Sequence, residues 1–136
     1  MNNLIPTDEL IEWLCKPEKL RLWMMFCQAF DEDMPTACAA TGALANLAID
    51  ERLGEAMAKK EDSLKILIEL ATCGKLDLEH RAVVSLLYLI DSWPGGEGKN
   101  KLIEAGAVSA FEKVVRDYPD SAVAQVAKDG LEVLNK

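Results

Sequence analysis

The sequence is short of the residues on which most enzymes and metal sites depend. Its 136 residues include one histidine, His80, and four cysteines without CxxC spacing, at positions 15, 27, 38 and 73. A hydrolytic triad or a zinc site needs several such side chains at fixed spacings. We therefore expect no metal and no other cofactor, and we expect that the protein is not an enzyme.

Long apolar runs and basic clusters are also missing. No apolar stretch approaches the ~18 residues of a membrane span, and the start MNNLIPTDEL lacks the pattern of a signal peptide. The formal net charge is −8, without a stripe of Lys and Arg among aromatics, so the surface repels phosphates and anionic lipids. We therefore predict a soluble protein that binds neither nucleic acid nor membrane. Because the cysteines lie inside apolar segments and lack CxxC spacing, we also predict a reducing, cytoplasmic compartment.

Two short motifs suggest ligand sites but lack the residues that such sites need. PGGEGKN (94–100) resembles a phosphate-binding loop, yet Walker A chemistry requires Gly where Trp93 stands and Ser or Thr where Asn100 stands. We interpret this segment as an inter-helix loop with Trp93 partly exposed. The acidic run 31–33 lacks the twelve-residue ligand pattern of a calcium loop and is expected to be a solvated turn.

Helix-forming apolar residues are abundant. Half of the chain is apolar, only 6% is aromatic, and five prolines interrupt it, a balance that favours helix over strand. We expect Ser63 and Asp120 near the starts of the fifth and last helices, and Gly74 after the fifth. Hydrophobic periodicity predicts helices near 8–15, 18–30, 36–49, 51–59, 63–73, 78–92, 98–105, 107–117 and 121–135.

The helices repeat. CAATGALANLAID (38–50) matches HRAVVSLLYLIDS (80–92) in apolar pattern at a shift of 42, and VAKDGLEVLNK (126–136) is a third copy. Segments 57–72 and 102–117 align at a shift of 45, and Gly106 is expected to allow a sharp turn between two helices through a positive φ. A period of ~40–47 residues is typical of armadillo and HEAT arrays. We predict an all-α, armadillo/HEAT-like right-handed superhelical solenoid of about three repeats.

We predict one domain over 1–136, made of a partial repeat (1–50), a repeat (51–92) and a repeat with a C-terminal capping helix (98–136). The last helix has one polar face, as a solenoid end needs. The N-terminal edge is more apolar than a simple cap; it either packs over the first repeat or continues upstream, and it is a candidate surface for self-association. Its apolar side chains are Trp13, Leu14, Leu22, Trp23, Met24, Met25 and Phe26.

Asn46 is the main candidate binding residue, because it is polar within the otherwise apolar segment ALANLA (43–48). Burying an unpaired amide costs on the order of 1–3 kcal/mol, so Asn46 should face a buried partner or an open groove. The segment resembles the armadillo motif, in which a third-helix asparagine on the concave surface hydrogen-bonds the backbone of an extended ligand. The matching residue in the next repeat is Tyr88, which interrupts the asparagine ladder that a nuclear-import protein would carry.

Four further residues complete the predicted partner-binding groove. Gly42 lies on the helix of Asn46, and Tyr88 either forms a wall of the groove or packs between repeats. His80 and Arg81 open the long helix, where they are either surface and capping residues or a pair of donors at the groove edge.

Residues 37–135 also resemble the C-terminal armadillo repeats of UCS-domain myosin chaperones. The similarity lies in ACAATGALANLA, in LEHRAVVSLLYLI and in AKDGLEVL, where LEHRA (78–82) has Ala82 in place of the glycine of an LxHRG-like start. The resemblance implies a co-chaperone that grips an unfolded or partly folded myosin motor domain in its concave groove. The tetratricopeptide module of animal members has no counterpart in this chain.

Taken together, these patterns predict a non-catalytic protein-binding scaffold that holds an extended segment in a concave groove. The first hypothesis is a client-binding module of a myosin-directed co-chaperone. The alternative is a generic armadillo adaptor for signalling or transport complexes.

Overall fold

The computed structural model describes residues 8–59, 61–92 and 97–135, and the structural statements below concern these residues. Over these ranges the chain forms nine α-helices and no strand, so the nine predicted helices are confirmed. The largest difference between a predicted and an observed helix end is in the fifth helix, which was predicted to end at residue 73 and ends at residue 70. The helices are α1 (Asp8–Leu14), α2 (Pro17–Gln28), α3 (Met34–Leu47), α4 (Glu51–Lys59), α5 (Glu61–Leu70), α6 (Leu76–Ser92), α7 (Glu97–Ala105), α8 (Ala107–Asp117) and α9 (Ala122–Leu134).

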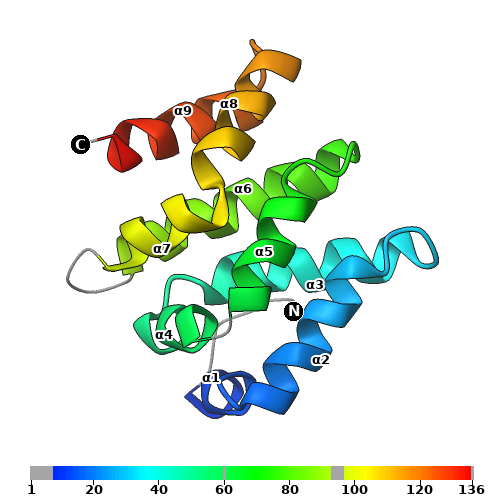
Figure 1. Ribbon diagram of the computed structural model, residues 1–136. Coiled ribbons are helices and arrows are strands. Elements are labelled where there is room, and N and C mark those ends of the chain that lie inside the picture. Colours follow the sequence, from blue (N-terminus) through cyan, green and yellow to red (C-terminus); the bar gives the residue numbers. More distant parts are fainter. Residues whose placement is uncertain (1–7, 60, 93–96, 136) are drawn as a thin grey trace.

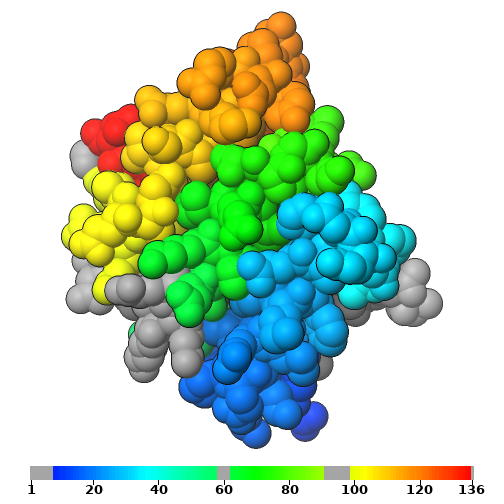
Figure 2. Space-filling model, turned by 45° about the vertical axis from the view of Figure 1, so that its right-hand side comes forward, coloured from blue at the N-terminus to red at the C-terminus, as the bar shows by residue number. Residues whose placement is uncertain are grey.

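The helices are stacked in the order of the sequence. Figure 1 shows that α1–α3, α4–α6 and α7–α9 follow one another across the molecule, and in Figure 2 the colours likewise run from blue at one end to orange at the other. The third helix of each set packs against the next, α3 against α6 and α6 against α9. The first set, predicted to be partial, holds three helices like the others; the exact division into repeats remains a prediction.

Two helix starts show the capping chemistry that fixes them. Asp33 precedes α3 and accepts the Thr36 N–H at 3.2 Å and the Thr36 hydroxyl at 2.7 Å. The acidic run 31–33, predicted to be a solvated turn, is exposed. Ser121 caps α9, because its hydroxyl accepts the Ala124 N–H at 3.1 Å. Ser63 and Asp120 both lie near these helix starts, as predicted, but neither caps a helix: Ser121 takes the capping role in α9, and Ser63 is buried inside α5, which begins at Glu61.

Gly74 and Gly106 make the two sharp turns that the sequence predicts. Their φ angles are +86° and +103°, in the left-handed region that a side chain with a Cβ rarely adopts. Gly74 follows α5, and Gly106 stands between α7 and α8. Glycine at these positions allows each following helix to leave in a new direction.

Burial supports one repeat alignment and corrects the other. Leu44 and Leu86, which match at the shift of 42, are both fully buried. The shift of 45 instead places exposed Lys65 on buried Ala110, whereas shifts of 43 and 44 each place Leu67 and at least one other buried residue of α5 on buried residues of α8. The reason is that α8 enters the core directly after Gly106, while Asp62, near the start of α5, is still exposed.

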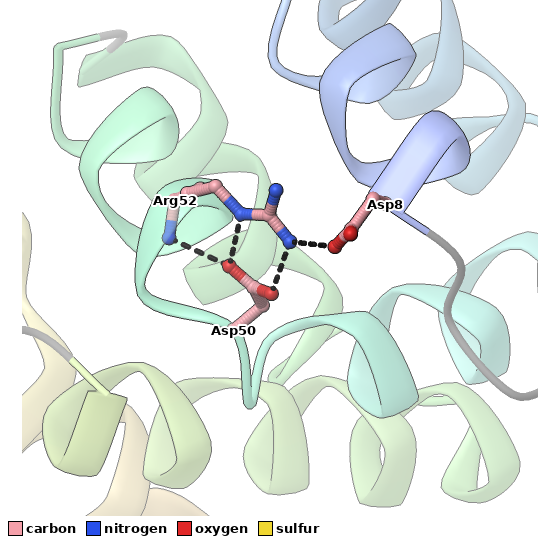
Figure 3. Close-up of polar contacts among 3 residues, drawn as sticks. All are labelled: Asp8, Asp50 and Arg52. Carbon is pink, nitrogen blue, oxygen red and sulfur yellow. Dashed lines mark hydrogen bonds and ion pairs between the residues drawn. The ribbon is translucent and has the colours of Figure 1, made fainter.

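Polar contacts tie the first helices to the rest of the stack. In Figure 3 the Arg52 guanidinium lies between Asp8 and Asp50, donating to each at 2.9 Å. Arg52 lowers the pKa of the Asp50 carboxyl chiefly by this hydrogen bond. The Trp23 indole Nε1–H donates to the Ala40 carbonyl at 3.0 Å and joins α2 to α3. These contacts are exposed or half-buried, so they orient α1 and α2 more than they stabilise them.

Candidate functional site

Helices α3 and α6 pack side by side, and we call a set of their exposed and half-buried positions the third-helix face. On each helix its members recur at three- and four-residue spacings and are exposed or half-buried. They are Ala39, Gly42, Ala43 and Asn46 from α3, and His80, Arg81, Val84 and Tyr88 from α6. The five predicted site residues therefore all lie on this face.

Asn46 points to solvent from an otherwise apolar helix. Its side chain is exposed and forms no hydrogen bond within the described part of the chain, whereas its neighbours Ala45 and Leu47 are buried. Both the donor and the acceptor of the amide are therefore free to pair with another molecule. Tyr88 holds the equivalent place on α6, but its ring is half-buried and packs against the core.

Arg81 and Gly42 come together across two repeats. Arg81 extends from α6 and donates from Nη1 to the Cys38 carbonyl of α3 at 2.5 Å. Its side chain lies over Gly42, where an added Cβ would come within 2.6 Å of Nη1. Gly42 thus leaves the space in which the guanidinium rests.

His80 contributes less than its neighbour. It is half-buried, and no hydrogen bond joins it to the described residues. At Arg81 the backbone carbonyl, rather than the guanidinium, accepts a hydrogen bond from the buried Ser85 hydroxyl at 2.8 Å. Of the predicted donor pair, Arg81 is the residue that reaches across to α3.

Glu79 is an important residue that the sequence analysis missed. Its side chain is buried, and its Oε2 accepts the Gly74 N–H at 3.1 Å. The neighbouring Glu79 carboxylate raises the pKa of Tyr118, and burial adds to the shift. Glu79 therefore links the turn before α6 to the end of α8. Its position inside LEHRA, five residues after Gly74, is the signal that would have identified it.

The N-terminal edge exposes large apolar side chains on α1 and α2. Of the seven residues predicted there, Leu14 and Met24 are buried in the core and Trp23 is half-buried. The other four residues of this predicted set are exposed. The Lys19 Nζ lies over the Trp13 ring, 5.5 Å from the ring centroid. Together with Leu10, the exposed members are Trp13, Leu22, Met25 and Phe26, with exposed fractions between 37% and 56%.

Other possible sites are distinct from the third-helix face. A hollow of about 490 Å³ lies between α1, α2 and α4, and one of about 370 Å³ lies between α2 and α5; no predicted site residue lines either.

The four cysteines are free, and burial raises the pKa of the Cys27 thiol to about 11. In the described ranges no three His, Cys, Asp or Glu side chains gather as metal ligands. No described helix combines the length and hydropathy that a membrane span requires. Trp93, predicted to be partly exposed, lies outside the described residues.

Comparison with known proteins supports the fold. No family model and no curated protein matches the sequence. Among solved structures, a designed armadillo repeat protein matches 95% of this chain with a TM-score of 0.76 and 25% sequence identity. The chain spans about half, 52%, of the length of that designed protein. The predicted all-α solenoid of the armadillo type is thus confirmed, whereas the resemblance to UCS-domain chaperones remains a prediction.

Proposed function

We propose that this chain is a non-catalytic protein-binding module that holds an extended client segment on the third-helix face. The observation that carries the proposal is the exposed amide of Asn46, which has no hydrogen bond among the described residues and lies near the C-terminal end of α3 in the otherwise apolar segment 43–48. An amide can donate to and accept from the backbone of an extended peptide at once. Such pairing is independent of the client's side chains, so it gives affinity without fixing the sequence.

The neighbouring side chains supply selection. The half-buried ring of Tyr88 offers an apolar wall, and Arg81 offers a cation held in a fixed place. Rigid presentation matters because a preorganised surface loses less conformational freedom when it binds. The stacked helices therefore act as the scaffold, and the third-helix face provides the contacts.

The client that we propose first is a partly folded myosin motor domain. The support is the resemblance of residues 37–135 to the C-terminal repeats of UCS-domain chaperones, including LEHRA at the start of α6. The alternative is an armadillo adaptor with a different client. Both use the same surface, and they differ in which protein is bound.

The test is binding of the purified chain to a heat-destabilised myosin motor domain. Asn46→Ala should weaken binding several-fold, since one hydrogen bond with a net worth of about 0.5–1.5 kcal/mol is lost. The matched control is Asn100→Ala on α7, which removes an exposed helical amide outside the third-helix face. Circular dichroism of each variant shows whether the helices are intact.

Three outcomes separate the hypotheses. Weaker binding by Asn46→Ala with unchanged binding by Asn100→Ala supports the proposal and the myosin client. Absence of motor-domain binding, with another protein bound in an Asn46-dependent way, supports the adaptor. If Asn46→Ala unfolds the domain while binding per folded molecule is unchanged, Asn46 is structural and the site assignment fails.

The exposed N-terminal edge supports a second activity, the pairing of two copies of the chain. Arg21, Met24, Met25 and Gln28 face α5 across the hollow on one side of α2, whereas Leu22 and Phe26, one turn apart, do not line it. A side of a repeat that carries exposed apolar residues and meets no other repeat among the described residues resembles half of a repeat interface.

Light scattering tests this pairing directly. If two copies pair through this edge, the wild type has the mass of a dimer, and the double variant Leu22→Glu, Phe26→Glu has the mass of a monomer. Ile103→Glu is the matched control, because Ile103 is also an exposed apolar residue but lies on α7. A monomeric wild type, or a dimer that survives the double variant, would disprove the pairing.

A further inference from the structure

Helix α3 carries no charge of its own. Its sequence, MPTACAATGALANL, contains no Asp, Glu, Lys or Arg, although 28% of the chain is charged. The charged group that the structure places over α3 is the Arg81 guanidinium, which reaches across from α6. Arg81 therefore places a positive charge beside Gly42, whereas the Asp33 carboxylate lies at the start of the same helix.

Arg81 is fixed in place but has no acidic partner. One nitrogen, Nη1, donates to the Cys38 carbonyl, and no described carboxylate forms an ion pair with the side chain. Arg52 and Lys113, by contrast, each pair with an aspartate. The Nε and Nη2 edge of Arg81 consequently keeps two parallel N–H donors unused, the arrangement that a carboxylate accepts as a bidentate pair.

Gly42 determines where this guanidinium lies. An added Cβ would come within 2.6 Å of Nη1 and 3.5 Å of Cζ of Arg81. The nearest atom belongs to the end of a flexible side chain, so a larger residue would displace the guanidinium without disturbing the backbone. Gly42 is therefore a positioning residue for Arg81.

We propose that the third-helix face selects client segments that carry an acidic side chain, and that the Nε and Nη2 edge of Arg81 binds this carboxylate. The inference rests on the proposed binding function and adds the class of segment that is bound. A carboxylate fits better than a phosphate backbone, because the net charge of −8 disfavours polyanions while one guanidinium edge matches one carboxylate.

The experiment selects peptides from a random phage-displayed library on the wild-type chain and on Arg81→Gln. Arg116→Gln is the matched control, since Arg116 is an exposed arginine on α8, outside the third-helix face. The wild type and Arg116→Gln should enrich peptides with an Asp or Glu at one fixed position. Arg81→Gln should lose the acidic preference at that position.

Affinities of one enriched peptide then measure the contact. Changing its acidic residue to the corresponding amide should weaken binding to the wild type roughly ten-fold, the order of magnitude for a charge-assisted bond. The same change should have little effect on binding to Arg81→Gln. Gly42→Ala should weaken binding of the acidic peptide several-fold with helicity preserved, because the guanidinium is displaced.

The outcomes distinguish this inference from the proposed function. If no peptide is enriched on the wild type, the peptide-binding function itself is wrong, and the inference fails with it. If peptides are enriched without an acidic residue, or if Arg81→Gln keeps the acidic preference, the function stands and the inference is wrong. If Gly42→Ala binds the acidic peptide as the wild type does, Gly42 does not position Arg81.

Discussion

Two helical glycines, Gly42 and Gly130, lie under large side chains from neighbouring helices, and the two contacts differ in kind. At Gly42 in α3 the covering group is Arg81, an exposed side chain that ends in a flexible guanidinium. At Gly130 in α9 it is Phe111 of α8, a fully buried ring whose nearest atoms lie 2.7, 3.0 and 3.1 Å from the place of an added Cβ.

The difference shows two reasons for a glycine inside a helix. Relative to alanine, glycine costs about 1 kcal/mol at such a position, so each needs a compensating gain. At Gly130 the gain is close packing of a rigid ring in the core. At Gly42 little core packing is involved, because Arg81 is exposed; the gain lies in the placement of a cation on the surface. The first glycine serves stability, and the second serves the proposed site.

Gly130→Ala should have the largest effect on stability. The added methyl must displace a buried ring, and overpacking of this kind costs about 1–3 kcal/mol, which outweighs the better helix propensity of alanine. Urea denaturation followed by circular dichroism measures the loss. Phe111→Leu in the same chain should recover part of it, because leucine is smaller and not planar. Unchanged stability of Gly130→Ala would mean that the α8–α9 contact is not rigid.

Gly42→Ala should have a smaller effect of the opposite sign. The methyl displaces only the end of Arg81, so the gain in helix propensity, up to about 1 kcal/mol, should remain largely intact. The same urea titration should therefore show equal or greater stability than the wild type. A loss as large as that of Gly130→Ala would show that Arg81 is held as tightly as Phe111, and the comparison would break down.

The sequence predicts the elements well and their contacts less well. Apolar periodicity and the turn glycines locate nine helices, since these signals are local. The alignment of α5 with α8 at a shift of 45 does not match their buried residues, because periodicity does not show where a helix first meets the core. Asn46 was identified because a polar residue in an apolar helix is conspicuous. The packing of Arg81 on Gly42 joins positions in different repeats, and the contact of Glu79 with Tyr118 crosses from α6 to α8, so neither follows from a local pattern.

The smallest expected effect concerns Tyr118, and it extends the comparison from packing to polar contacts. The interaction with the buried Glu79 carboxylate raises the pKa of Tyr118, so the folded state favours the neutral phenol. The stabilisation is therefore complete below the ordinary tyrosine pKa of about 10 and is lost as the pH rises through the raised value.

Tyr118→Phe should consequently be less stable than the wild type near neutral pH, and the difference should shrink in strong alkali. Urea midpoints of both chains from about pH 8 to about pH 11 measure this convergence. The remaining tyrosine, Tyr88, is present in both chains, so its contribution cancels. Arg81→Gln is the control from the other contact: it removes the bond to Cys38 and leaves Tyr118 in place, so its stability difference from the wild type should stay constant over this range. A constant difference for Tyr118→Phe would show that the interaction of Glu79 with Tyr118 contributes no more to folding than the exposed contact of Arg81 with Cys38.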